Sequence, residues 1–137
     1  YINLEPANGF MPVAVVLDTN FLLLPFQRII DIESSIERLL EEPHFFVVLS
    51  QCVDELREMA SKQRKFSPAA RAALSFVSKR GFVVEKGFPG LPDNALLDYC
   101  KAKHATLCTL DAGLRRRAKE ASIKVIFLRD KGHLALA

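Results

Sequence analysis

Four acidic residues stand where apolar runs end or where the following helices are expected to begin. Asp18 follows the run Val13–Leu17, and Asp111 follows the run 105–110. Glu55 lies in the helix expected after a second run, and Asp93 opens a helix after a turn-rich loop. In a parallel sheet these positions gather at the carboxyl edge. The pattern therefore predicts that four carboxylates meet at one edge.

Four carboxylates in one place repel each other and raise one another's pKa values, which a fold tolerates when a cation is bound. A set of oxygen donors without His or Cys suits Mg²⁺ or Mn²⁺. Such a site can activate water and hold a scissile phosphate, which indicates phosphodiester hydrolysis.

Each acid also has an ordinary structural interpretation. Asp18, Asp93 and Asp111 all precede expected helices and could be N-caps, a role that is compatible with metal binding. Glu55 lies too deep in its helix to cap it. Its alternative is a solvated helix face, the commonest position of a glutamate.

The elements that must position these acids alternate along the chain. Apolar strands are expected at 13–17, 45–49, 82–84, 105–110 and 124–128. Amphipathic helices are expected between them, with Asp31, Ser50, Ser67 and Asp93 as candidate caps. This alternation predicts an α/β fold, a three-layer α/β/α sandwich with a mostly parallel five-stranded sheet. Residues 11–137 are expected to form a single domain, whereas residues 1–10 have no clear period and are set apart as an N-terminal extension or as residues added for expression.

Composition narrows the class of protein. The chain has 137 residues, of which 50% are hydrophobic and 26% charged, so it is globular. The net charge of +3 is too small to indicate a polyanion partner by itself. Three cysteines without a C-x-x-C spacing are expected to be reduced core residues of a cytoplasmic protein. No apolar run approaches the ~20 residues of a membrane span.

Four segments in order carry a family resemblance. They are Val15-Val16-Leu17-Asp18-Thr19-Asn20, Ser50-Gln51-Cys52-Val53-Asp54-Glu55, Pro92-Asp93-Asn94-Ala95-Leu96-Leu97-Asp98 and Thr109-Leu110-Asp111-Ala112-Gly113-Leu114. Over residues 11–130 the chain resembles the PIN-domain nucleases. The segment 93–129 most resembles the branch involved in ribosomal RNA processing, including its archaeal members.

The resemblance implies an Mg²⁺- or Mn²⁺-dependent endoribonuclease that cleaves single-stranded RNA. It implies that the catalytic residues and metal ligands are Asp18, Glu55, Asp93 and Asp111, and that Asn20 and Thr109 steady the site. Asp98 matches a further acid of many members, or is a surface acid near Lys101. Asn94 stands where many relatives have a second acid. Thr19 is expected only to begin its helix.

Basic residues near these motifs are candidates for RNA contact through phosphates. Arg115 and Lys119 share a helix face. Arg116 lies beside Arg115, and Lys101 lies near the end of the preceding helix. Their alternative role is ordinary solubility. No histidine is adjacent to a motif acid, so none is assigned as a general base.

Several functions remain open at this stage. A nuclease of this kind acts in ribosomal RNA maturation, with pre-ribosome proteins as partners, or as the toxin of a toxin–antitoxin pair, with an antitoxin as partner. A non-catalytic PIN module that binds RNA or protein is a third function, and a homodimer would suit the family. A haloacid dehalogenase phosphatase is disfavoured, because Asn20 stands where its second aspartate is required. No glycine-rich loop follows the first run, which disfavours nucleotide-binding folds.

Overall fold

The first strand, β1 (Val13–Leu17), is the centre of the fold. Four of its five side chains are buried, because an entirely apolar strand can be covered on both faces. The computed structural model describes residues 11–137. The expectation for residues 1–10 lies outside this range.

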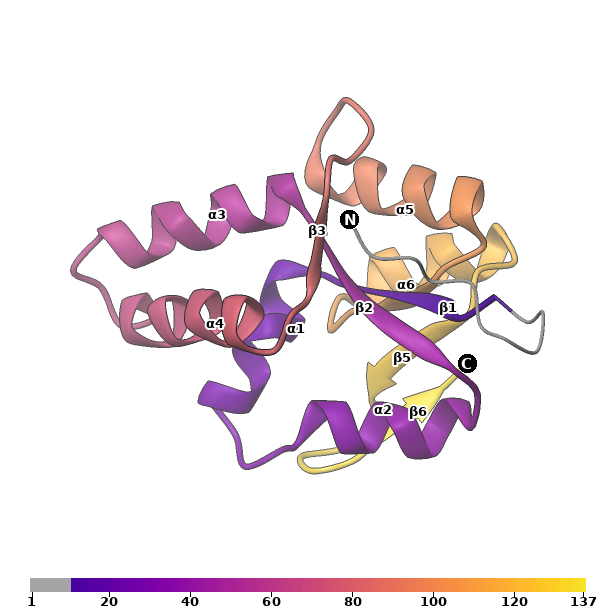
Figure 1. The fold of residues 1–137 in the computed structure, drawn as a ribbon, viewed down its shortest axis with the longest axis horizontal. Coiled ribbons are helices and arrows are strands. Elements are labelled where there is room, and N and C mark those ends of the chain that lie inside the picture. Colours follow the sequence, from indigo (N-terminus) through magenta and orange to yellow (C-terminus); the bar gives the residue numbers. More distant parts are fainter. Residues whose placement is uncertain (1–10) are drawn as a thin grey trace.

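The sheet has six strands in the order β3-β2-β1-β4-β5-β6 (Figure 1). β2 (His44–Leu49), β3 (Val83–Glu85), β4 (Thr106–Cys108) and β5 (Val125–Leu128) continue the parallel sheet around β1. β6 (Leu134–Leu136) pairs antiparallel with β5. The α/β sandwich with a mostly parallel sheet is confirmed. The expected number of five strands is wrong by one, because β6 forms a strand only by pairing with β5.

Helices flank the sheet and connect its strands (Figure 1). They are α1 (Thr19–Leu23), the 3₁₀ turn η1 (Leu24–Phe26), α2 (Ile32–Leu40), α3 (Ser50–Ser61), α4 (Ser67–Lys79), α5 (Pro92–Lys103) and α6 (Ala112–Glu120). α3 and α4 lie side by side and project from the sheet, whereas α5 packs over β1 and β4. This packing places the starts of α1, α5 and α6 near the same strand ends.

Three helices begin with an aspartate cap. The carboxylates of Asp18, Asp31 and Asp111 accept hydrogen bonds from the backbone N–H groups of Phe21, Ser34 and Leu114. These bonds satisfy amide groups that the first helical turn leaves without partners. Asp31 caps α2 as expected, and Asp18 and Asp111 are caps of the kind that their positions allowed.

Three other expected caps lie inside their helices. The N-cap positions are Leu49 in α3, Phe66 in α4 and Leu91 in α5, so Ser50, Ser67 and Asp93 are not side-chain caps. The Ser67 hydroxyl instead donates to Met59 O at 2.7 Å and accepts from Arg64 N, which ties α4 to the end of α3. Asp93 is exposed in the first turn of α5.

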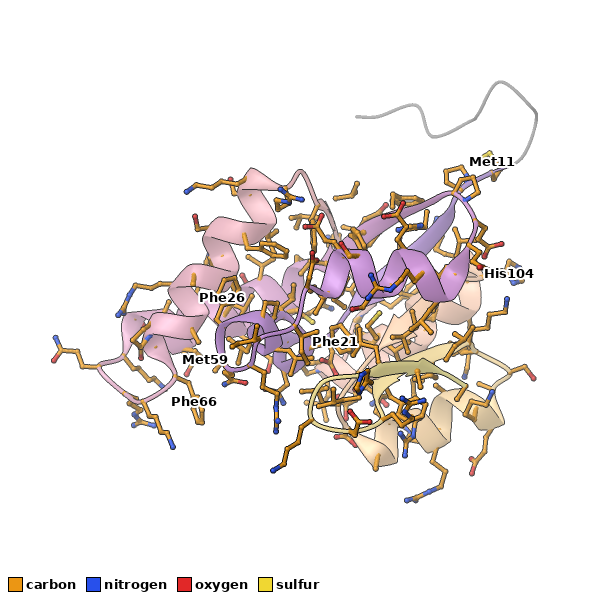
Figure 2. All side chains as sticks on the ribbon, turned by 90° about the horizontal axis from the view of Figure 1, so that it is seen from below. Met11, Phe21, Phe26, Met59, Phe66 and His104 are labelled. Atoms are coloured by element: carbon orange, nitrogen blue, oxygen red, sulfur yellow. The ribbon has the colours of Figure 1, made fainter. Side chains whose placement is uncertain are left out.

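The core is apolar and contains all three cysteines. Phe21, which is labelled in Figure 2, is fully buried. Cys52, Cys100 and Cys108 are buried and form no disulfide. The expected core position of the cysteines is therefore confirmed. None of the helices in the described part of the chain has the length and apolar character that a membrane crossing requires.

Candidate active site

Asp18 and Asp111 lie at the point where the strand order reverses. β1 leads to β2 on one side and β4 leads to β5 on the other, so the neighbours β1 and β4 form the switch point of the sheet. The backbone N–H of Asp18 donates to Cys108 O at 3.1 Å, which joins the two strand ends. Ligands of open α/β sheets bind in the crevice outside such a switch point.

Asp18 is a buried carboxylate held by two donors. Its side chain is 8% exposed; Oδ1 accepts from Phe21 N at 2.8 Å and Oδ2 accepts from the Thr109 hydroxyl. Burial raises the pKa of Asp18 to about 6, and the charges of Asp93 and Asp111 add to the rise, while the two hydrogen bonds oppose it. The repulsion that the sequence predicts among the acids is therefore present at Asp18.

Thr109 connects the two acids of the switch point. Its side chain is fully buried, and its hydroxyl oxygen also accepts the backbone N–H of Asp111 at 3.1 Å. Asp111 uses Oδ1 to cap α6 through Leu114 N at 2.9 Å. One hydroxyl therefore orients Asp18 and fixes the backbone at Asp111.

Glu55 reaches the same place from α3. Its side chain is half-buried, and Oε1 accepts a hydrogen bond from the Thr19 hydroxyl at 3.0 Å. Thr19 is itself buried at the start of α1. The expectation that Thr19 only begins a helix is wrong, because its hydroxyl orients Glu55.

All four acids line one cavity of about 390 Å³, which we call the acid cavity. Asn20 and Arg117 line it with them, and Cys52 lies in its wall. Asp98 does not line this cavity and is exposed on α5. Asn94, which follows Asp93, accepts a hydrogen bond from the Arg117 guanidinium at 2.6 Å. The carboxylates from four separate elements are therefore brought together.

The donor set fits a hard divalent cation. Carboxylate oxygens are ligands of Mg²⁺ and Mn²⁺, and oxygens that accept one hydrogen bond keep a further lone pair. Within residues 11–137, no three acid, His or Cys side chains are close enough to enclose an ion. The acids instead surround an open cavity. Mg²⁺ usually keeps several waters and binds through one or two carboxylates, so an open arrangement suits it.

The basic residues are distributed differently from the expectation. The Arg115 guanidinium stacks over the Phe127 ring at 4.1 Å, outside the acid cavity. Arg116 and Lys119 are exposed. Lys101 borders another cavity, with Val13 and Lys124, at the amino ends of the strands. Contact of these residues with RNA stays a prediction.

Arg117 is the basic residue that the sequence reasoning did not single out. Among the described residues that line the acid cavity, it alone carries a positive side chain. Arg115 and Arg117 lie on either side of the buried stripe formed by Leu114 and Ala118. The helical period of the sequence places Arg115 and Arg117 on opposite sides of this stripe, but it does not predict which of the two faces the acids.

Comparisons with known proteins identify the family and the fold. A sequence model of the PIN like domain matches residues 15–131. Ribonuclease VapC4 of Methanocaldococcus jannaschii is 27% identical over 124 residues, which cover 89% of this chain and 95% of that protein. Two solved structures share the fold. The PIN domain endonuclease Utp24 has a TM-score of 0.76 at 17% identity, covering 91% of each chain. A domain of a functionally unknown protein from Methanocaldococcus jannaschii has a TM-score of 0.63 at 18% identity, covering 86% of this chain and 92% of that one.

Proposed function

The chain belongs to the PIN-like domain family, and from this premise we propose that it is a metal-dependent endoribonuclease that hydrolyses single-stranded RNA. The convergence of Asp18, Glu55, Asp93 and Asp111 on one cavity carries the proposal. The similarity to a protein named as a ribonuclease supports RNA as the substrate.

Carboxylates of the acid cavity would hold Mg²⁺ or Mn²⁺ together with bound waters, and the ion would supply an activated water and stabilise the leaving oxygen when bound. Two of these acids are oriented in advance. Thr109 fixes the Asp18 carboxylate and Thr19 fixes the Glu55 carboxylate. Asp93 and Asp111 are exposed, and they carry the site to the surface, where a long substrate can reach it. Preorganised ligands of this kind reduce the rearrangement needed during the reaction.

The cysteine in the cavity wall is unsuited to covalent catalysis. Cys52 lines the acid cavity, but burial raises the pKa of its thiol to about 11. The thiol is therefore protonated at neutral pH and a poor nucleophile. Arg117 brings positive charge to the same wall, where it can balance the acids or contact a phosphate oxygen.

A cleavage assay tests this proposal. A labelled single-stranded RNA should be cut internally when Mg²⁺ or Mn²⁺ is present, and EDTA should abolish cleavage. Asp18→Asn, Glu55→Gln and Asp111→Asn should each remove activity. Asp54→Asn is the matched control, because Asp54 lies beside Glu55 but is exposed and forms an ion pair with Arg57 on the surface of α3. Metal-dependent cleavage that survives Asp18→Asn would exclude the acid cavity as the active site.

Two cellular roles follow for such an enzyme. The resemblance of segment 93–129 supports ribosomal RNA maturation, in which pre-ribosome proteins would be partners. The similarity to Ribonuclease VapC4 supports a second candidate, a toxin controlled by an antitoxin. Expression of the wild type and of Asp18→Asn separates the two: growth arrest by the wild type alone indicates the toxin, and cleavage of precursor ribosomal RNA without arrest indicates maturation.

A further inference from the structure

A larger groove adjoins the acid cavity. It has a volume of about 850 Å³ and runs between η1 and the connection from α3 to α4. Asn20 and Asp111 line both the groove and the acid cavity, so the two adjoin at these residues. We call it the aromatic groove, and the side chains that characterise it are Phe26, Arg28, Met59, Lys65, Phe66 and Leu110.

The aromatic groove exposes large apolar side chains. Phe66 is 48% exposed, Phe26 is 39% exposed and Leu110 is 37% exposed. Figure 2 shows Phe26, Met59 and Phe66 together at the end of the molecule where α3 and α4 project. Single exposed apolar residues are ordinary, but several that line one groove mark a binding surface. Phe66 and Met59 also line a smaller cavity of about 360 Å³ that reaches Glu55.

Positive charge accompanies these aromatic rings. Arg28 follows η1, and Lys65 Nζ lies 5.7 Å from the centre of the Phe66 ring. Neither side chain forms a salt bridge within residues 11–137. The acid that lines the groove is Asp111, which belongs to the acid cavity. The groove thus combines ring faces with two cations that form no salt bridge in the described part of the chain, and it adjoins the acid cavity at one end.

We propose that the aromatic groove binds the unpaired nucleotides next to the scissile bond of a single-stranded RNA. Bases stack on Phe66 and Phe26, and Lys65 and Arg28 contact the adjacent phosphates. This inference rests on the proposed ribonuclease function. Aromatic platforms beside a basic track are how proteins hold single strands, because unpaired bases expose their faces and paired bases do not.

The position beside the acid cavity favours RNA over a protein partner. A chain bound in the groove reaches Asn20 and Asp111, which also line the acid cavity. A substrate has to contact both the groove and the acids in this way. A protein seated in the groove would leave Arg28 and Lys65 without acidic partners unless it supplied them, whereas a nucleic acid carries a phosphate at every residue.

Binding is measured apart from cleavage. A short fluorescein-labelled single-stranded RNA of mixed sequence is titrated with the protein in EDTA, and again with the Asp18→Asn variant in Mg²⁺. Fluorescence anisotropy gives Kd. Phe66→Ala should raise Kd about tenfold, as for the loss of one stacked base. Phe66→Trp should keep the affinity, because it retains a ring. Lys65→Ala should weaken binding and lower the salt dependence by about one phosphate contact.

Matched controls lie elsewhere on the surface. Phe88→Ala removes an aromatic ring that is 39% exposed outside the groove. Lys124→Ala removes a lysine at the amino ends of the strands. Neither should change Kd. Unlabelled single-stranded RNA of the same sequence, added as a competitor, should displace the labelled RNA from the protein. The same RNA annealed into a duplex should displace it poorly.

The outcomes separate this inference from the proposed function. Phe66-dependent binding without metal-dependent cleavage would leave the groove in place and overturn the nuclease proposal. Cleavage with Kd values for Phe66→Ala and Lys65→Ala within about twofold of wild type would overturn the groove. Failure of the RNA to bind under both conditions would overturn it as well. A change of oligomeric mass in Phe66→Ala, with RNA affinity intact, would instead assign the groove to a protein contact.

Discussion

The hydroxyl of Thr109 donates a hydrogen bond to Oδ2 of Asp18 from the neighbouring strand end. The same oxygen accepts the backbone N–H of Asp111 at 3.1 Å. Thr109 is fully buried, so no water replaces these bonds. Two acids of the proposed site therefore depend on one hydroxyl that is ninety-one residues from Asp18 in sequence.

Thr109→Val tests that dependence, because valine has the shape of threonine without the hydroxyl. In the wild type, the hydrogen bond from Thr109 lowers the pKa of Asp18, which is about 6. Without this bond, the pKa of Asp18 should rise above that value. A larger fraction of Asp18 is then protonated near neutral pH and unable to hold a cation. The acidic limb of the pH–rate profile should move to higher pH. Thr109→Ser keeps the hydroxyl and should keep the wild-type profile; a wild-type profile in Thr109→Val would contradict the assigned role.

Asp18→Asn should stabilise the metal-free fold while removing activity. Burial raises the pKa of Asp18 from 3.8 to about 6, so the folded state binds the proton more tightly than the unfolded state. Stability therefore falls as pH rises through this window, and above it the charged carboxylate costs up to roughly 3 kcal/mol. Asparagine carries no charge. The melting temperature of Asp18→Asn in EDTA should exceed that of the wild type at about pH 7.5 and match it more closely near pH 4.

Mn²⁺ supplies the control for this experiment. An ion that binds only the folded state raises the melting temperature of the wild type. It should raise that of Asp18→Asn much less, since a ligand is gone. If Asp18→Asn is less stable than the wild type in EDTA at a pH above the pKa of Asp18, then the buried charge of Asp18 does not destabilise the fold as proposed.

The sequence alone predicts that these acids lie near one another, for a simple reason. Apolar runs fix the strands, parallel strands share a carboxyl edge, and Asp18 and Asp111 follow two of those runs. Asp93 became clearer in the structure, because it is not the cap that its position allowed. The sequence does not predict the hydrogen bond from Thr19 to Glu55, because this bond depends on how α3 is rotated relative to α1.

Other details depend on packing that local pattern does not encode. Arg115 and Arg117 differ by about 200° around α6, so one can face the acids only if the other does not. Which arginine faces the acids depends on how α6 is oriented on the sheet. In this orientation the Arg115 guanidinium contacts Phe127 of β5. β6 was not foreseen because its three residues form a strand only by pairing with β5.

The three cysteines should resist thiol reagents in the folded protein. Burial raises the pKa of Cys52 to about 11 and that of Cys100 to about 12, and it raises the pKa of Cys108 as well. The thiolate is the reactive form, and these thiols are also shielded. Native protein should show no fast reaction with a chromogenic disulfide reagent, and protein in concentrated guanidinium chloride should release three equivalents. One fast equivalent in the native state would show that the acid cavity opens to Cys52.

Arg117→Ala should lower RNA cleavage more than Arg115→Ala. Arg117 lines the acid cavity and donates to Asn94 at 2.6 Å, and Asn94 is next to Asp93 in the first turn of α5. Loss of the guanidinium removes both a positive charge near the acids and a restraint on the segment that carries Asp93. An effect of about tenfold on kcat is expected for one charge-assisted hydrogen bond. Arg115→Ala should lower cleavage less than Arg117→Ala and should lose roughly 0.5–1 kcal/mol of stability, because its contact is with Phe127.

A double-mutant cycle decides whether Arg117 acts through Asn94. If it does, Asn94→Ala should reproduce the loss, and the double variant should be little worse than either single variant. If Arg117 contacts a phosphate of the substrate directly, the two effects should add and KM should rise with Arg117→Ala alone. Arg117→Lys helps to separate the two, since lysine keeps the charge but not the planar fork that reaches Asn94. Greater loss of activity in Arg115→Ala than in Arg117→Ala would contradict both roles and move the RNA path to the other flank of α6.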